Sequence, residues 1–283
     1  MRYRLRYTPD RLEYNSADME GQAEEPSRAQ ETPSKPWGAD FPRLLQAQYA
    51  SFQEDLPFWL TLAASGPGPI LELGCGPGRV LSVLAQAGFE VDGLDYDPEM
   101  LRRAASRLPT SQRGPVSLIQ GDLGRFSLGR KYGLILLPCN TFAILDESAA
   151  EESLACIRRH LLPGGVFAAE LPSPHEALEF HVDPAEPIDA FVEPETGNPI
   201  QVYADQRAEA GQNFVQVAWR YDELRPDGTV IRTQVPMLYY LWSPEGLGEA
   251  ARRSGFSSHE AFGDYDRRPF SPDSPRLLFI ACA

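Results

Sequence analysis

The sequence of 283 residues lacks the features that mark several common classes of protein. No apolar run reaches the roughly 20 residues that a membrane-spanning helix needs, and the opening residues, MRYRLRYTPD, have no hydrophobic centre of the kind that a secretory signal requires. The four cysteines are scattered without a CxxC pair, so neither a disulfide framework nor a zinc site is indicated, and we expect no metal. These absences together predict a protein of the reduced cytoplasm.

Positive charge and histidine are also scarce. The chain has 26 Lys and Arg residues against 40 Asp and Glu residues, a formal net charge of −14, and only 4 histidines that could act as bases. Binding to a nucleic-acid duplex needs a basic surface that displaces counterions, and the sequence has no basic cluster with interleaved aromatics. We therefore expect no nucleic-acid or membrane partner. A small molecule is the better candidate for a substrate.

What the sequence does contain is an alternation of strand and helix patterns. Five short apolar runs read as strands: 70–73, 89–94, 116–119, 132–137 and 166–171. Single helices separate them, which predicts a parallel sheet with right-handed crossovers. The pattern changes after residue 172, where a loop-like stretch rich in Pro and Glu runs to residue 199. Longer alternating runs follow and predict an antiparallel ribbon.

These patterns divide the chain into four parts. Residues 1–36 are rich in Glu, Pro, Ser and Gln and predict a disordered tail. Residues 37–171 predict an α/β core that begins with two short helices divided at Pro57. Residues 172–242 predict the antiparallel ribbon, laid over the core, and residues 243–283 complete the core with a helix and two strands. Six aromatic residues alternate along the ribbon, and we expect about half of them to line a pocket: Tyr203, Trp219, Tyr221, Tyr239, Tyr240 and Trp242.

The most informative stretch is ILELGCGPGRV, which places Gly74, Gly76 and Gly78 between a strand and a helix. Backbone amides converge at such a turn, and missing side chains let a ligand touch the main chain. The stretch is not a dinucleotide fingerprint, because the third glycine of that pattern would fall on Arg79, and it is not a Gly-Lys-Ser/Thr phosphate loop. Glu72 would repel a pyrophosphate but suits a ligand with an ammonium group. S-adenosylmethionine has an amine, a carboxylate and a sulfonium, and no phosphate.

At this point the sequence resembles the class I S-adenosylmethionine-dependent methyltransferases, from roughly Tyr49 to the C-terminus. LELGCGPGR is similar to the family's first motif, VDGLDYDPEML to the second and IQGDL to the third, while LILLPCNTFAIL stands at the position of the fourth and HLLPGGVF is similar to the run into strand five. The resemblance implies a Rossmann-like α/β fold: a seven-stranded, mostly parallel sheet with an antiparallel final strand, plus the inserted antiparallel ribbon. It also implies S-adenosylmethionine as the cofactor.

The resemblance further implies roles for individual residues. Asp95 would bind the ribose hydroxyls, Tyr96 would stack on or edge the adenine, Asp122 would lie near the exocyclic amine of the adenine, and the Leu123 amide would lie near a ring nitrogen. Tyr49 would close over the donor. The whole set of implied donor contacts is Tyr49, Glu72, Gly74, Cys75, Gly76, Gly78, Asp95, Tyr96, Asp122, Leu123 and Pro138.

The subgroup and the acceptor are indicated more coarsely. YASFQEDLPFWLTLA resembles the lid helices of small-molecule methyltransferases, and the ribbon and the ending resemble bacterial amino-sugar and glycine-type N-methyltransferases. Leu-Pro-Cys-Asn stands where enzymes that methylate nucleobase amines have Asn/Asp-Pro-Pro-Tyr/Phe. The hypothesis is therefore methyl transfer to a nitrogen or oxygen of a small metabolite.

A neutral amine would need no strong base, whereas a phenol or alcohol would need one, and the candidates for a catalytic group are His175, His181 and Asn140. Two alternatives stay open, a nicotinamide-dependent oxidoreductase and a non-catalytic protein that binds S-adenosylmethionine. Asp122 also has a purely structural alternative, an Asx turn.

Overall fold

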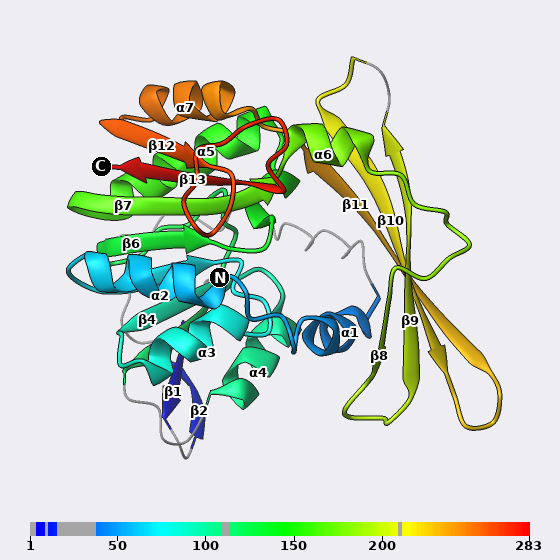
Figure 1. The fold of residues 1–283 in the computed structure, drawn as a ribbon. Coiled ribbons are helices and arrows are strands. Elements are labelled where there is room, and N and C mark those ends of the chain that lie inside the picture. Colours follow the sequence, from blue (N-terminus) through cyan, green and yellow to red (C-terminus); the bar gives the residue numbers. More distant parts are fainter. Residues whose placement is uncertain (1–3, 9–10, 16–37, 109–113, 209–210) are drawn as a thin grey trace, which may run out of the picture.

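A large mixed sheet forms the centre of the computed structural model, which describes residues 4–8, 11–15, 38–108, 114–208 and 211–283. The strand order is β12-β13-β7-β6-β3-β4-β5-β1-β2 (Figure 1). Five of these strands run parallel: β3 (Ile70–Leu73), β4 (Val91–Asp95), β5 (Val116–Gln120), β6 (Tyr132–Leu137) and β7 (Leu161–Pro172). The last strand, β13 (Arg276–Cys282), pairs antiparallel with β7 and with β12 (Ser258–Phe262). The expected seven-stranded sheet with an antiparallel final strand is confirmed.

Two short strands lie in the segment expected to be a disordered tail. β1 (Arg4–Thr8) and β2 (Arg11–Asn15) pair as an antiparallel hairpin, and β1 extends the sheet beyond β5. The sequence RLRYTPDRLEYN alternates apolar and charged residues on either side of the dipeptide Pro-Asp, which is a hairpin pattern that the overall composition of the segment hides. Residues 16–36 of the expected tail lie outside the described part of the chain.

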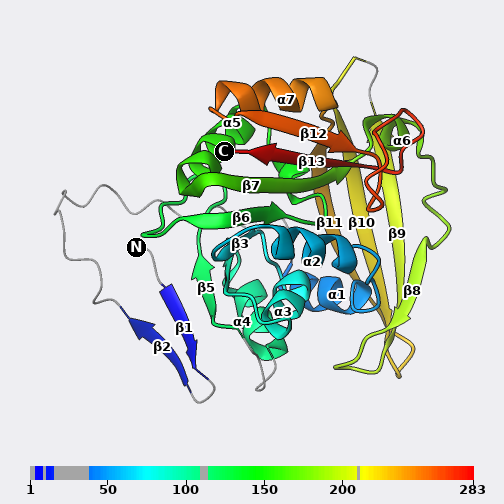
Figure 2. The same ribbon diagram turned by 60° about the vertical axis from the view of Figure 1, so that its left-hand side comes forward.

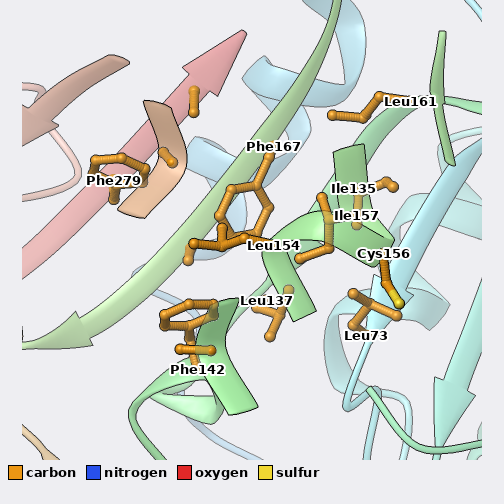
Figure 3. Close-up of a cluster of buried hydrophobic side chains, with 14 of the residues drawn as sticks. Leu73, Ile135, Leu137, Phe142, Leu154, Cys156, Ile157, Leu161, Phe167 and Phe279 are labelled. Atoms are coloured by element: carbon orange, nitrogen blue, oxygen red, sulfur yellow. The ribbon is translucent and has the colours of Figure 1, made fainter. Parts of the chain in front are cut away.

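Helices cover both faces of the sheet. One face packs against α2 (Leu56–Ser65), α3 (Arg79–Gln86) and α4 (Pro98–Arg107), and the other against α5 (Glu147–His160) and α7 (Pro244–Arg253). Asp97 and Ser243 cap α4 and α7 by accepting hydrogen bonds from the Glu99 and Gly246 amides, as their positions before a proline predict. Figure 3 shows the core on the α5 side, where Phe142, Phe167 and Leu154 are fully buried.

A second sheet stands apart from the first. It contains β8 (Asp189–Val192), β9 (Pro199–Ala208), β10 (Phe214–Leu224) and β11 (Val230–Tyr240), all antiparallel in the order β11-β10-β9-β8. The expected ribbon is therefore a four-stranded sheet. The expectation of a loop-like stretch from 172 to 199 is wrong, because this stretch contains α6 (Pro174–Glu179) and β8. β8 is a short edge strand paired with β9, and so short a strand shows little alternation of apolar and polar residues in the sequence.

The second sheet faces the carboxyl ends of the parallel strands, and α1 (Phe41–Gln48) lies between the two sheets (Figures 1 and 2). Ion pairs join the second sheet and its loops to α1 and α4. Arg43 of α1 donates to Glu193 Oε2 and Glu223 Oε2, both at 2.7 Å, and Arg103 of α4 donates to Glu195 Oε1 at 2.6 Å. Within the described ranges, no helix has the length and apolar character to cross a membrane.

Candidate donor and acceptor site

A cavity of about 460 Å³ opens between the carboxyl ends of β3 to β6 and the second sheet. This is the edge where parallel α/β sheets bind ligands, and the volume is that of a typical small-molecule site. The cavity brings together every implied donor contact except Gly78: Tyr49, Glu72, Gly74, Cys75, Gly76, Asp95, Tyr96, Asp122, Leu123 and Pro138.

The three glycines after β3 have different structural roles. All have positive φ, +63° at Gly74, +52° at Gly76 and +78° at Gly78, where other residues are strained. A Cβ on Gly76 would meet nothing within 4 Å, so the bare backbone of this residue faces open space. A Cβ on Gly78 would lie 3.0 Å from the Ala104 Cβ, which means that Gly78 permits α3 to pack on α4. The structure therefore assigns Gly78 to packing and leaves it outside the cavity.

Asp95 is fixed at the end of β4 by backbone donors. The Gly76 amide donates to its Oδ2 at 2.8 Å and the Asp97 amide donates to its Oδ1 at 2.9 Å. Each oxygen keeps a second lone pair for a ligand hydroxyl. Burial raises the pKa of Asp95 to about 6 despite these hydrogen bonds. The carboxylate thus ties the glycine loop to the neighbouring strand at a place where a ribose could be bound.

Glu72 is a buried carboxyl with an unpaired oxygen. The side chain is only 3% exposed, and its Oε2 has no hydrogen-bond partner. Burial, opposed by Arg79 and assisted by the carboxylates of Asp55 and Asp95, raises the pKa of Glu72 to about 8. An unpaired buried oxygen is costly unless a ligand satisfies it. A cationic group in the cavity fits this position.

Arg79 begins α3 and forms a buried pair that the sequence did not indicate. Its two terminal nitrogens donate to Asp55 Oδ1 and Oδ2, both at 2.6 Å, and the Trp59 indole donates to Asp55 Oδ2 at 2.9 Å. Arg79 also lies 3.0 Å from the Cys139 sulfur. The pair joins the second lid helix to the glycine loop, and its only signal in the sequence is an arginine directly after the last glycine.

The loop after β6 has an unusual backbone. Cys139 and Asn140 both have positive φ, +56° and +60°, which costs about 1–3 kcal/mol for a non-glycine residue. The Cys139 amide donates to Glu170 Oε2 at 3.2 Å, and the Tyr265 hydroxyl donates to Glu170 Oε1 at 2.7 Å. Burial raises the pKa of the Cys139 thiol to about 12. Asn140, expected as a catalytic candidate, lines the cavity, whereas the supporting pair of Glu170 and Tyr265 was missed.

Aromatic side chains of the second sheet form the wall opposite the glycines. Trp219, Tyr221 and Tyr239 line the cavity together with Tyr49 from the end of α1. The Tyr221 hydroxyl donates to Gln48 Oε1 at 2.8 Å. The other three aromatics of the expected set lie elsewhere: Tyr203 under Arg220, Tyr240 against Phe214 and Trp242 against Phe142. The expectation that about half of the set lines a pocket is confirmed.

Three residues that the sequence indicated as functional candidates have surroundings that differ from the expected ones. His175 and His181 lie on and just after α6, both exposed, and neither lines the cavity. The structure therefore does not support them as general bases, because α6 turns away along the far end of β9, where Gln206 bonds to the Ala177 carbonyl. Asp122 lines the cavity, but its Oδ1 also accepts from the Gly124 amide at 2.8 Å, which is the Asx turn of the structural alternative.

Known proteins share this fold and parts of this sequence. Residues 70–165 match the family model described as a methyltransferase domain. The Bacillus subtilis protein YqeM, which is named as a methyltransferase, is 24% identical over 79% of this chain and 87% of its own length. The dTDP-3-amino-3,4,6-trideoxy-alpha-D-glucopyranose N,N-dimethyltransferase of Streptomyces venezuelae is 29% identical over 43% of this chain, which spans half the length of that protein.

A solved structure gives a match over nearly the whole chain. CalS10, an amino pentose methyltransferase from Micromonospora echinaspora solved with S-adenosylmethionine, has a TM-score of 0.60 at 19% identity over 92% of this chain and 99% of its own. The order of the strands and the antiparallel last strand define a Rossmann-like α/β fold, with the cavity at the carboxyl ends of its parallel strands. Residues 70–165 therefore form a methyltransferase domain, which together with the relatives supports S-adenosylmethionine-dependent methyl transfer, and CalS10 shows the same fold.

Proposed function

We propose that this enzyme transfers the methyl group to the nitrogen of a small-molecule amine, with the donor on the glycine side of the cavity and the acceptor on the aromatic side. The observation that carries the proposal is that the unpaired Glu72 oxygen and the bare backbone of Gly76 belong to one cavity, which is also lined by aromatic residues of the second sheet. Neither feature serves the packing of the fold. Both fit a ligand that has an ammonium group and a nucleoside.

We assign the donor half as follows. The Asp95 carboxylate holds the ribose hydroxyls, Glu72 pairs with the amino group, and the open backbone at Gly76 allows close approach of the donor. Tyr96 and Asp122 lie on the adenine side, and Tyr49 closes the cavity from α1. These assignments agree with the position of each residue on the wall of one cavity.

S-adenosylmethionine supplies a methyl group that is already electrophilic, so the protein has to position the acceptor and exclude water. A nitrogen acceptor fits the groups around the aromatic wall better than an oxygen acceptor, which would need a base. Burial raises the pKa of the Tyr49 hydroxyl and the Cys139 thiol, so both stay protonated near neutral pH. Both Glu170 oxygens already accept hydrogen bonds. A neutral amine needs none of these groups as a base.

Calorimetry with S-adenosylhomocysteine tests the donor half. Asp95→Ala should weaken binding about 10- to 100-fold, the worth of hydrogen bonds to a charged group. Asp205→Ala, on a partly exposed side chain of β9 outside the cavity, should leave binding unchanged and serves as the matched control. Equal affinities of the Asp95 variant and the wild type would contradict the site.

The acceptor half needs a panel of amines and matched alcohols, with release of S-adenosylhomocysteine as the readout. Turnover of amines without turnover of the alcohols is expected, and turnover of alcohols alone would favour oxygen transfer. We also infer that the partner is a small molecule and not a nucleic acid, because the cavity is enclosed by apolar side chains. A reducing, cytoplasmic setting agrees with the four free thiols.

A further inference from the structure

We infer that the acceptor end of the cavity selects a hydrophobic amine that carries no phosphate or carboxylate group. The inference rests on the proposed function, since it describes the substrate class of the same site. It follows from what the wall of the acceptor end is made of, and from how the charged groups around the cavity are already paired.

The wall of the acceptor end includes four aromatic side chains and the thioether of a methionine. Tyr49 comes from α1, Trp219 and Tyr221 from β10, and Met237 and Tyr239 from β11. Cross-strand pairing places Val217 opposite Met237 and Val215 opposite Tyr239, so these side chains share one face of the second sheet. Aromatic faces attract cations through their quadrupole, and quaternary and alkylated ammonium groups are the ligands that such walls recognise.

The carboxyl and guanidinium residues on the cavity wall are three acids and one base. In the described part of the chain these residues are Glu72, Asp95, Asp122 and Arg79. The only cation among them, Arg79, is bound by both nitrogens to the fully buried Asp55. A phosphate or carboxylate on the acceptor would therefore meet carboxylates and no free cation.

The arginines that flank the cavity are also paired. Arg43 donates to both Glu193 and Glu223. Arg103 donates to Glu99 and Glu195, and Arg276 lies 3.1 Å from Asp264 and 3.5 Å from Glu170. An anionic acceptor would have to break one of these pairs to find a counter-ion.

The direction of charge movement in the reaction agrees with this wall. The lone pair of the acceptor nitrogen forms the new N–C bond while the C–S bond breaks and sulfur keeps its electron pair as a thioether. One positive charge thus moves from sulfur to nitrogen, and the ammonium product later releases a proton to water. The aromatic wall lies where this charge arrives, so it favours the transition state as well as the product.

This substrate class differs from that of the Streptomyces venezuelae relative, whose name specifies a dTDP-linked sugar and therefore a diphosphate. The two proteins match over 43% of this chain. Their difference in acceptor would come from the charge and the aromatic content of the wall and would not require a different donor site.

Two probes that differ in charge and share a benzyl group test the inference. Benzyltrimethylammonium and benzylphosphonate both have a tetrahedral head group, and their binding to protein saturated with S-adenosylhomocysteine is measured by calorimetry. The cation should bind at least about tenfold more tightly than the anion. Trp219→Leu should remove most of this preference, and Trp219→Phe should keep it. Tyr203→Leu, an aromatic of the same sheet outside the cavity, is the matched control and should change nothing.

The possible results separate this inference from the proposed function. If S-adenosylhomocysteine binds but the phosphonate binds as tightly as the cation, or neither probe binds, the acceptor class is wrong and the donor site stands. If S-adenosylhomocysteine itself does not bind, the proposed function fails and the inference fails with it. Trp219→Leu must also keep wild-type affinity for S-adenosylhomocysteine. A loss there would mean that the variant disturbs the whole cavity, and the wild-type and Trp219→Phe proteins then decide the question: if either binds the phosphonate as tightly as the ammonium, the inference is overturned.

Discussion

Glu72 should make donor binding depend on pH in a direction that follows from its surroundings. In the empty cavity its pKa is raised to about 8 by burial, so about 1% of the side chain is ionised at pH 6 and about a quarter at pH 7.5. A ligand ammonium pairs with the ionised form. Affinity for S-adenosylhomocysteine should therefore rise about twentyfold over this interval, or about 1.8 kcal/mol at 1.36 kcal/mol per tenfold change.

Calorimetry at pH 6.0, 6.75 and 7.5 measures this slope. Glu72→Gln should remove most of it, because the amide does not titrate and only Asp95, whose pKa is about 6, still does. Glu176→Gln, an exposed residue outside the cavity, should keep the wild-type slope. The ligand's own amino group stays mostly protonated below pH 7.5. A wild-type affinity that changes less than about twofold, or a slope that survives in Glu72→Gln, would refute the pairing of Glu72 with the ammonium group.

The same raised pKa has the opposite effect on the stability of the empty protein. A carboxyl whose folded pKa lies above its unfolded value stabilises the fold below the unfolded value, about 4.3 for Glu, and this contribution is lost as the pH rises through the folded value. Glu72→Gln should therefore raise the melting temperature of the ligand-free protein at pH 8.5 and change it little at pH 4. Equal shifts at both pH values would show that Glu72 is not held protonated by burial.

Four further substitutions separate packing from binding. Gly76→Ala should lose donor affinity in calorimetry and cost about 1–2 kcal/mol of backbone strain, whereas Gly78→Ala, which meets Ala104, should cost more stability in urea unfolding than Gly76→Ala does. Arg79→Met leaves the buried carboxylate of Asp55 unpaired and should cost about 3–5 kcal/mol of unfolding free energy in urea. The double variant Arg79→Met/Asp55→Asn should recover part of this loss. Arg43→Met should destabilise the protein most at neutral pH. Burial alone would raise the pKa of the Glu193 and Glu223 carboxyls, but their hydrogen bonds hold both pKa values below 4.5. The difference in unfolding free energy between variant and wild type should therefore shrink as the pH falls below 4.5.

The sequence was most informative where a local signal is tied to a backbone requirement. The positive φ of Gly74 and Gly76 could be expected from a strand that ends in alternating glycines, and the capping residues Asp97 and Ser243 precede prolines as helix starts do. Such signals depend on neighbours within a few residues. They predicted the order of strands and helices and the edge of the sheet at which the cavity lies.

The sequence was least informative about contacts between distant segments. Arg79 and Asp55 are 24 residues apart, and Glu170 and Tyr265 are 95 residues apart. No periodicity links them, because each pair forms only after the sheet has assembled. The second sheet shows the same limit: alternation predicted its strands, but its placement depends on Arg43 meeting two glutamates from separate loops and strands.

These distant contacts also connect the two halves of the cavity to each other. Arg79 bonds to Asp55 at the start of the second lid helix and reaches the sulfur of Cys139 after β6. The amide of Cys139 in turn bonds to Glu170, which Tyr265 holds from near the end of the chain. A chain of packed polar contacts therefore runs from the glycine loop to the residues beside the acceptor. The contacts of Arg79 with Asp55 are buried and those of Cys139 and Glu170 are partly buried, so we expect a change at the glycine loop to be passed to the loop after β6 and to couple the positions of the proposed donor and acceptor.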